Sequence, residues 1–371
     1  MIPVCKPTFI KNEKNFVYEC LEDCWISSKG KFIEAFEEQF SKFCECKYGV
    51  TCSNGTTALH LALLSLGIVE GDEVIVPNFS MIAVPNSVIY SKATPVFVDA
   101  EIDTWNINPE QIEKKITDKT KAIIVVHTYG LPVNMDRINR IAKKHNLKVI
   151  KDCAEAHGAI FKGKKVGSLG DVATFSFYGN KIITTGEGGM VVTNNEEIAN
   201  KCKLLRNHAF EENRFIHNEI GFNYRMTNIQ AAIGVAQTAQ ANKLIEMRIE
   251  NAKMYDKLLK GIKGITLPPR CSNSKNVYWM YGILVDKEKY GMDKDTLMEA
   301  LKKTGIDTRS FFYPCNKQPA YLKLKNIDCE GEYKVSNTLY EKGFYLPSAS
   351  CLTDKEIKRI CETIRGFQNE N

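Results

Sequence analysis

Short apolar runs rich in β-branched residues alternate with longer amphipathic segments over the first half of the chain. Between about residues 47 and 195 the apolar runs predict strands and the segments between them predict helices. The expected strands are Gly49–Cys52, Glu73–Pro77, Thr94–Val98, Ala122–Val126, Leu147–Ile150, Ala173–Phe177 and Gly189–Thr193, and the expected helices are Thr56–Leu66, Met81–Ser91, Pro109–Lys114 and Met135–His145. This alternation indicates an α/β fold with a mostly parallel, seven-stranded sheet between helices.

The pattern changes after residue 226. Thr227–Lys260 has a helical pattern with Gly234 as its only glycine, which predicts one long helix that links a large unit to a smaller one. Beyond it we expect strands at Tyr278–Val285 and Ile306–Phe312 and helices at Asp295–Lys303, Glu332–Tyr340 and Asp354–Phe367. At the start of the chain, Phe9–Phe43 predicts two amphipathic helices joined at Trp25–Gly30. We therefore expect a large domain over residues 1–245, with an N-terminal helical segment, and a smaller α+β domain over residues 246–371.

Composition narrows the class of protein. The 371 residues are 44% hydrophobic and 25% charged, as in a globular protein with a sizeable core. The formal charge of +6 is spread along the chain, and no basic run alternates with aromatic residues, which argues against nucleic-acid binding. No apolar stretch approaches the ~20 residues of a membrane span, and the first residues lack the apolar core of a signal peptide. The thirteen cysteines are irregularly spaced, so we expect reduced thiols, no metal site and a cytoplasmic protein.

Two places at the predicted carboxyl ends of strands could bind a cofactor, because open α/β sheets bind ligands there. Ser53–Thr57 ends a strand and opens a helix, so its backbone N–H groups suit a phosphate, although an ordinary helix N-cap has the same composition. Asp152 follows the strand at Leu147–Ile150. A carboxylate in this position either caps the next helix or keeps a ring nitrogen protonated by opposite-charge pairing.

A third place contains a lysine with unusual neighbours. Lys181 lies between the apolar run Thr174–Phe177 and a glycine-rich bend that ends at Gly189. Most lysines are ordinary surface residues, but burial of the amine lowers its pKa and makes it nucleophilic toward a carbonyl. An aldehyde cofactor held as a Schiff base needs such an amine, and its pyridine ring needs an anionic partner such as Asp152.

Taken together, four motifs resemble a known family. SNGTTALHLAL, KDCAEAHGA, TFSFYGNKIITTGEGG and GFNYRMTNIQAAIG occur in the order and spacing of the DegT-type nucleotide-sugar aminotransferases. These are pyridoxal phosphate (PLP) enzymes of fold type I, and the resemblance covers nearly the whole chain. Within the family the chain is most similar to the perosamine-forming branch.

The resemblance implies roles for particular residues. Lys181 would bind the cofactor covalently and shuttle protons, and Asp152 would pair with the pyridine nitrogen. The remaining cofactor-binding positions implied are Gly55, Thr56, Met81, Glu155, Ser176 and, toward the cofactor of a partner subunit in a homodimer, Asn223. Met81 departs from the family, which usually has an aromatic residue stacked on the ring there. A thioether can also lie against a ring, and the alternative is a core residue. Candidates for the substrate cleft are Ser27, His127, Tyr129, Arg225 and Arg309; the alternatives for His127 and Arg309 are a strand-end hydrogen bond and a surface cation.

The implied reaction moves the amino group of L-glutamate to the keto carbon of a nucleotide-linked 4-keto-6-deoxy sugar, with pyridoxamine phosphate between the two halves. The branch favours GDP-4-keto-6-deoxymannose as substrate and GDP-perosamine as product, within polysaccharide or O-antigen biosynthesis. UDP- or dTDP-4-keto-6-deoxyglucose remains an alternative, as do a cysteine desulfurase or amino-acid aminotransferase and a non-catalytic regulator of the same fold. The dehydratase branch has histidine in place of the lysine, so Lys181 argues against it.

Overall fold

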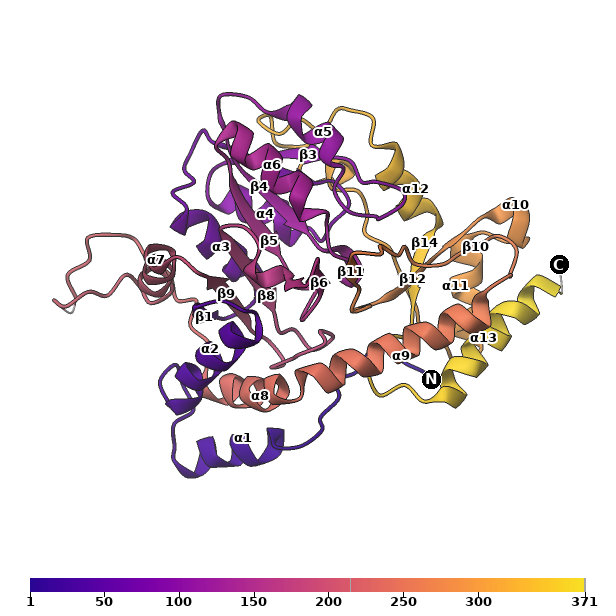
Figure 1. Ribbon diagram of the computed structural model, residues 1–371, viewed down its shortest axis with the longest axis horizontal. Helices are drawn as coiled ribbons and strands as arrows, with labels where there is room; N and C mark the ends of the chain where they lie inside the picture. The colour runs from indigo at the N-terminus through magenta and orange to yellow at the C-terminus, as the bar shows by residue number, and fades with distance from the viewer. Residues whose placement is uncertain (214, 370–371) are drawn as a thin grey trace.

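The computed structural model describes residues 1–213 and 215–369 and is built around a seven-stranded sheet (Figure 1). The strand order is β1-β9-β8-β5-β4-β2-β3. Neighbouring strands are parallel except for β9, which is antiparallel to both β1 and β8. The bounds are Tyr48–Cys52 (β1), Glu73–Pro77 (β2), Thr94–Val98 (β3), Thr120–Val126 (β4), Lys148–Asp152 (β5), Val172–Ser176 (β8) and Gly189–Thr193 (β9). All seven strands were predicted from the apolar runs, within one or two residues.

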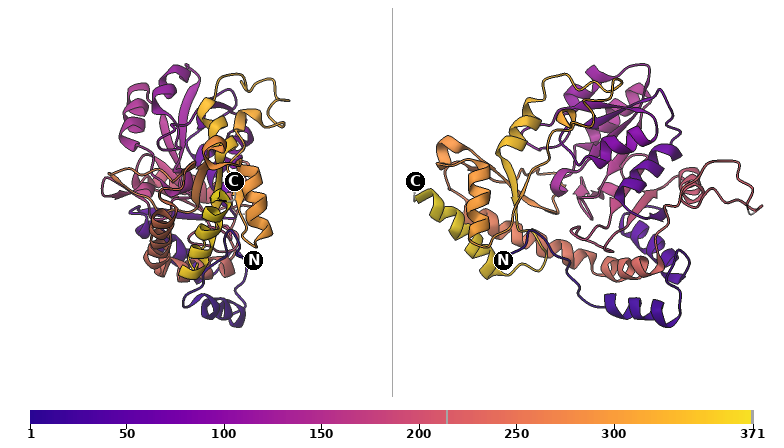
Figure 2. Two further views of the ribbon diagram at one scale, coloured as in Figure 1. Left: turned by 90° about the vertical axis from the view of Figure 1, so that its right-hand side faces the viewer. Right: turned by 180° about the vertical axis from the view of Figure 1, so that it is seen from behind.

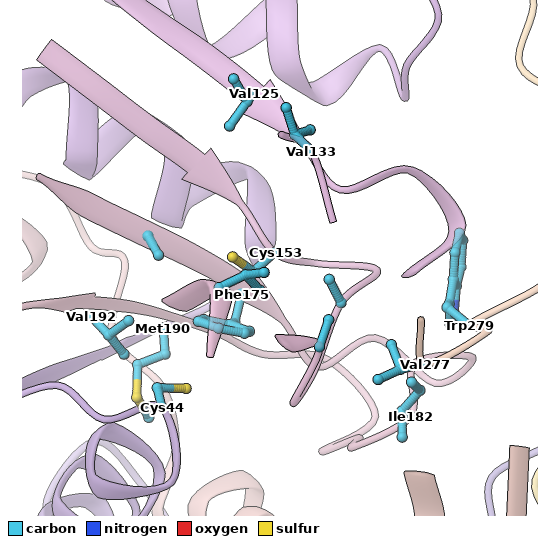
Figure 3. Packing of buried hydrophobic residues seen from close by; sticks show 14 of the residues in the cluster. Cys44, Val125, Val133, Cys153, Phe175, Ile182, Met190, Val192, Val277 and Trp279 are labelled. Atoms are coloured by element: carbon cyan, nitrogen blue, oxygen red, sulfur yellow. The ribbon is translucent and has the colours of Figure 1, made fainter. Parts of the chain in front are cut away.

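Both faces of this sheet are buried, because helices pack on each of them. Successive side chains of a strand point to opposite faces, so each strand contributes apolar residues to both layers. On one face Val74, Ile124 and Val191 pack with helices α3, α4 and α7. On the other, Ile75, Val125 and Val192 pack with α2, α6 and α8, and Figure 3 shows part of this second layer. The bounds are Lys31–Phe43 (α2), Gly55–Ser65 (α3), Ala83–Tyr90 (α4), Met135–His145 (α6), Glu196–Arg206 (α7) and Asn228–Ala239 (α8).

Smaller elements complete the sheet domain. Helix α1 packs on α8, and a three-stranded sheet has the order β11-β6-β7. A short helix and 3-10 turns lie between the larger elements. The bounds are Glu13–Glu22 (α1), Pro109–Ile112 (α5), Glu113–Lys115 (η1), Thr128–Gly130 (η2), Ile160–Phe161 (β6), Lys164–Lys165 (β7), Val166–Ser168 (η3) and Ser274–Lys275 (β11).

A second core lies in the C-terminal part, around a four-stranded antiparallel sheet of order β10-β12-β14-β13. Helix α9 runs from the end of α8 to this part of the molecule, where it packs against α13 (Figure 1). The bounds are Ala241–Leu259 (α9), Ile265–Thr266 (β10), Tyr281–Val285 (β12), Lys287–Tyr290 (α10), Lys294–Lys303 (α11), Arg309–Ser310 (β13), Cys315–Lys317 (η4), Lys334–Lys342 (α12), Gly343–Leu346 (β14) and Asp354–Asn369 (α13). The N-terminus joins this sheet region too, since Ile2 bridges to Ile306. The domain boundary at residue 245 falls inside α9 and stays a prediction.

The structure differs from the expected elements in several places. Helix α7 (Glu196–Arg206) and strand β14 (Gly343–Leu346) were not expected from the sequence. The single helix expected over Thr227–Lys260 is two helices, α8 and α9, that meet at Gln240. The backbone leaves the helical conformation at Gln240 (φ −108°, ψ 8°), where α8 ends and α9 begins. The strand expected over Ile306–Phe312 is also reduced to Arg309–Ser310, because only these residues pair with β14.

The close packing of α2 on α8 requires one glycine. A Cβ atom on Gly234 would lie 2.6 Å from the ring of Phe36, so any larger residue would push the two helices apart. Among the described residues, no helix is both long and apolar enough to cross a membrane, and no cluster of three or more histidine, cysteine or acidic side chains is arranged to hold a metal ion.

Candidate active site

A cavity of about 540 Å³ opens at the carboxyl ends of β4, β5 and β8. Val126, Asp152 and Ser176, the last residues of these strands, form part of its wall. Seven of the eight residues predicted to bind the cofactor line it: Gly55, Thr56, Met81, Asp152, Glu155, Ser176 and Lys181. A larger hollow of about 1070 Å³ over α2 contains none of the predicted site residues. The chemistry suggested by the sequence is therefore concentrated in the smaller cavity.

The N-terminus of α3 forms one wall. The side chain of Asn54 accepts the N–H of Thr57 (2.9 Å), and the hydroxyl of Thr57 accepts the N–H of Asn54 (3.2 Å), so the expected N-cap is present. The cap does not use the N–H groups of Gly55 and Thr56, and the first N–H groups of a helix have no partner within that helix. A Cβ atom on Gly55 would lie 2.7 Å from Cβ of Ser176, so only glycine lets the Ser176 hydroxyl approach these N–H groups. Such donors at a helix N-terminus suit an anion.

Lys181 enters the cavity from the loop after β8. This loop is fixed by its own backbone: the N–H of Lys181 donates to Tyr178 (2.9 Å), and the N–H groups of Phe177 and Thr185 bond to Gly188 and Phe177. The amine lies 3.7 Å from the centre of the Trp279 ring. Burial lowers the pKa of Lys181, while Glu155 and then Asp152 act in the opposite direction. A lowered pKa increases the neutral, nucleophilic fraction of the amine.

Two buried carboxyl groups share the cavity with this amine. Burial raises the pKa of Asp152, although the N–H of Ala154, which donates to Oδ1 (2.9 Å), and Lys181 both favour its ionised form. Burial raises the pKa of Glu155 from 4.5 to about 7, against the effects of Lys181 and of the Tyr129 N–H, which donates to Oε2 (2.7 Å). The site thus contains two carboxyl groups in different environments beside one amine, the arrangement that separates acid and base roles.

Met81 lies at the cavity and not in the core. It is 51% exposed, so its thioether is available to a ligand, which excludes the alternative of a core residue. Tyr129 lies behind the wall, where its backbone has a left-handed conformation (φ 53°) that directs its N–H to Glu155. Tyr129 therefore does not line the cavity and contacts it only through Glu155.

Five other predicted residues do not line this cavity. His127 is fully buried; its Nδ1 accepts the N–H of Val133 (3.0 Å), and burial lowers its pKa to about 3, so it is a neutral core residue. Arg225 donates to Asn207 (2.7 Å), and Arg309 is an exposed partner of Asp307. Ser27 and Asn223 are exposed as well. The structure of one chain gives these five no place at the site.

Four aromatic residues of the cavity were missed: Tyr178, beside Lys181, and three from the C-terminal part. Trp279, Phe312 and Tyr345 line it from the C-terminal part of the chain. Their separation from Lys181 in sequence gives no local signal, and a scattered aromatic residue is most often a core residue. Only the tertiary fold brings them to the amine.

Comparison with known proteins places this geometry in a family. Residues 7–365 match the model of the DegT/DnrJ/EryC1/StrS aminotransferase family. The chain belongs to this family. Its resemblance to that family is thus confirmed, together with the α/β fold and the assignment as an enzyme of the aminotransferase class.

Curated relatives cover the whole chain. It is 44% identical to a GDP-perosamine synthase of Escherichia coli O157:H7, over 100% of this chain and 99% of that protein. It is 40% identical to a GDP-perosamine synthase of Vibrio cholerae, over 100% of both chains. Among solved structures, Helicobacter pylori PseC, an aminotransferase involved in the biosynthesis of pseudoaminic acid, is 30% identical with a TM-score of 0.93 over 100% of both chains.

Proposed function

We propose that this aminotransferase transfers the amino group of L-glutamate to the keto carbon of GDP-4-keto-6-deoxymannose, with pyridoxal phosphate as cofactor, and so forms GDP-perosamine. The observation that carries the proposal is the convergence of Lys181, Asp152 and the N-terminus of α3 in one cavity. The choice of sugar is supported by the relatives named GDP-perosamine synthase, which match over the full length of the chain.

The cavity residues fit the chemistry of this cofactor. The N–H groups of Gly55 and Thr56 and the hydroxyl of Ser176 would hold its phosphate, since they form a cluster of donors at a helix N-terminus. Asp152 would pair with the pyridine nitrogen, and Met81 would lie against the ring. When bound, pyridoxal phosphate supplies an electron sink that stabilises a carbanion on the amino acid.

The chain's own groups would supply the amine and move the protons. Lys181 would hold the cofactor covalently through its neutral amine, and its Nζ would take up and return a proton. Asp152 would remain ionised opposite a protonated ring nitrogen, because that pairing offsets the effect of its burial. Glu155 is the second acid of the site and lies close enough to Lys181 to influence its charge.

Asn223 is proposed to act across a homodimer. It is exposed and follows a segment that projects from the body of the chain (Figure 2). In that segment Ile216 and Ile220 are 61% and 89% exposed, and clustered exposed apolar side chains mark interaction surfaces. We expect two inactive variants, Lys181→Ala and Asn223→Ala, to regain activity when mixed, since one site of the mixed dimer would be intact. Size-exclusion chromatography of each variant serves as the control, and no recovery from two dimeric variants would contradict a shared site.

A panel of substrates tests the reaction. The purified enzyme with pyridoxal phosphate and L-glutamate should aminate GDP-4-keto-6-deoxymannose, and Lys181→Ala should not. If the enzyme turned over only UDP- or dTDP-4-keto-6-deoxyglucose, that sugar would replace the GDP sugar as the proposed substrate. Only the dTDP nucleotide of that outcome has a counterpart among the relatives, since the chain is 37% identical to dTDP-3-amino-3,6-dideoxy-alpha-D-galactopyranose transaminase of Aneurinibacillus thermoaerophilus, whose name places the amino group at carbon 3. A protein that binds the cofactor but aminates none of these sugars would refute the proposal.

A further inference from the structure

Trp279 is a buried indole in the wall of the cavity, and three separate parts of the chain fix it. It is 4% exposed and lies in the segment before β12. Its Nε1–H donates to the carbonyl of Asn180 (2.9 Å), the residue directly before Lys181. Its own carbonyl accepts from Nη1 of Arg248 on α9. Figure 3 shows the ring near Ile182 and Val277, at the edge of the buried apolar cluster.

The supporting residues are themselves ordered by hydrogen bonds. Arg248 is 3% exposed and also donates from Nε to the hydroxyl of Ser350 (3.1 Å). The thiol of Cys5, from the N-terminal segment, donates to the same Asn180 carbonyl (3.4 Å). The ring of Tyr129 stacks on the indole, with centroids 6.2 Å apart and an interplanar angle of 29°. The orientation of the indole is thus set directly by Asn180 and Tyr129 of the sheet domain, and its backbone is held by Arg248 on α9.

The indole meets Lys181 in two ways. Its N–H bond to Asn180 restrains the backbone at the lysine, and its face lies 3.7 Å from the amine. Tryptophan offers the most favourable ring face for an ammonium group. The other titratable groups around this amine are Asp152, Glu155 and Cys5, which favour its charged form, and Arg248, which opposes it.

We propose that Trp279 is a positioning residue for Lys181: its ring face holds the free ammonium group, and its N–H fixes the backbone that carries it. The proposal rests on the role of Lys181 in the proposed function, but it concerns the lysine itself. It assigns to the C-terminal part of the chain a direct influence on the charge of the reacting amine. Without the Trp279 ring, Asp152 and Glu155 would keep a smaller fraction of the Lys181 amine charged and would position it less well.

The sign of one measurement separates this role from a purely structural one. If the ring stabilises the ammonium group, removing it lowers the pKa of Lys181, by about 0.4–1.5 units for a cation–π contact of ordinary strength. If the ring only excludes water, removing it admits water and raises the pKa instead, because desolvation is the largest influence on this amine. The two roles therefore predict shifts in opposite directions.

The experiment is competitive acetylation of the full-length chain without added cofactor, as a function of pH, with peptide mass spectrometry at Lys181. Exposed lysines of the same sample provide the internal reference. We compare the wild type with Trp279→Leu, which removes the ring, and Trp279→Phe, which keeps a weaker ring face and loses the N–H donor. Trp25→Leu is the matched control, because Trp25 is 54% exposed and does not line this cavity. Circular dichroism establishes that each variant is folded.

We expect the midpoint of Lys181 acetylation to fall in Trp279→Leu, to fall less in Trp279→Phe and to remain unchanged in Trp25→Leu. A midpoint that rises or stays constant in Trp279→Leu would overturn the proposal. If Trp279→Leu does not fold, Trp279→Phe decides, since a rise or no change in its midpoint is equally contradictory. The substrate panel is independent of this readout. If the wild type aminates the sugar but the Lys181 midpoint is the same in Trp279→Leu as in the wild type, only the positioning role is refuted.

Discussion

Replacement of Glu155 by glutamine should change how the stability of the chain depends on pH. Glu155 is 4% exposed, and its pKa in the folded chain is about 7, against 4.5 for an ordinary glutamate. The unfolded chain therefore releases this proton at a lower pH than the folded chain does. It follows that the contribution of Glu155 to stability is greatest below pH 4.5 and is lost as pH rises toward 7.

The structure gives the magnitude. A difference of about 2.5 pKa units corresponds to about 3 kcal/mol at 1.36 kcal/mol per unit, of which about 2–3 kcal/mol falls between pH 5 and pH 8. Glutamine has the shape of the protonated acid, and its side-chain oxygen can still accept the N–H of Tyr129. At pH 5 we therefore expect Glu155→Gln to be nearly as stable as the wild type. At pH 8 it should be more stable by about 2–3 kcal/mol.

The assay is urea unfolding of the chain without added cofactor at several pH values, followed by circular dichroism. Glu341→Gln serves as the matched control, because Glu341 is an exposed residue of α12 and should leave the pH dependence unchanged. A stability difference between Glu155→Gln and the wild type that is constant from pH 5 to pH 8 would refute the reasoning. It would mean that Glu155 titrates at an ordinary pKa despite its burial.

Three further substitutions test other parts of the structure. Asp152→Asn should lower kcat by at least about 10²-fold, because a neutral amide cannot hold a charged partner in the cavity; activity comparable to that of the exposed-site control Asp354→Asn would contradict its role. Gly234→Ala should destabilise the chain by about 1–3 kcal/mol in urea unfolding, since the added methyl group meets the ring of Phe36 at 2.6 Å; Gly366→Ala, where no atom lies within 4 Å, is its control, and equal stability of the two variants would show that α2 and α8 can separate without cost. Arg206→Met should cost about 3–5 kcal/mol, because it leaves the largely buried carboxylate of Glu37 without its cation; a variant as stable as the wild type in urea unfolding would contradict this expectation.

Several elements of the fold were predictable because their signals are local. The seven strands of the large sheet are apolar on both faces, so each is a short apolar run bounded by turn residues. The break between α8 and α9 was missed, since it falls at Gln240, where neither proline nor glycine marks it in the sequence. The short strand at Arg309 was overestimated, because its length depends on pairing with β14.

The sequence by itself predicted which residues near the sheet would carry the chemistry: Lys181, Asp152 and the helix start at Gly55 each follow a recognisable strand, and parallel strands bring their carboxyl ends to one edge. Tertiary structure alone decided the rest of the cavity. It placed the indole of Trp279 3.7 Å from the amine, although 98 residues separate Trp279 from Lys181 in the chain. It also placed His127 outside the cavity, where burial keeps the imidazole neutral. The physical reason is that the ends of strands are specified by residues nearby in the sequence. Contacts between the large sheet and the C-terminal part instead depend on how α9 packs the two parts together.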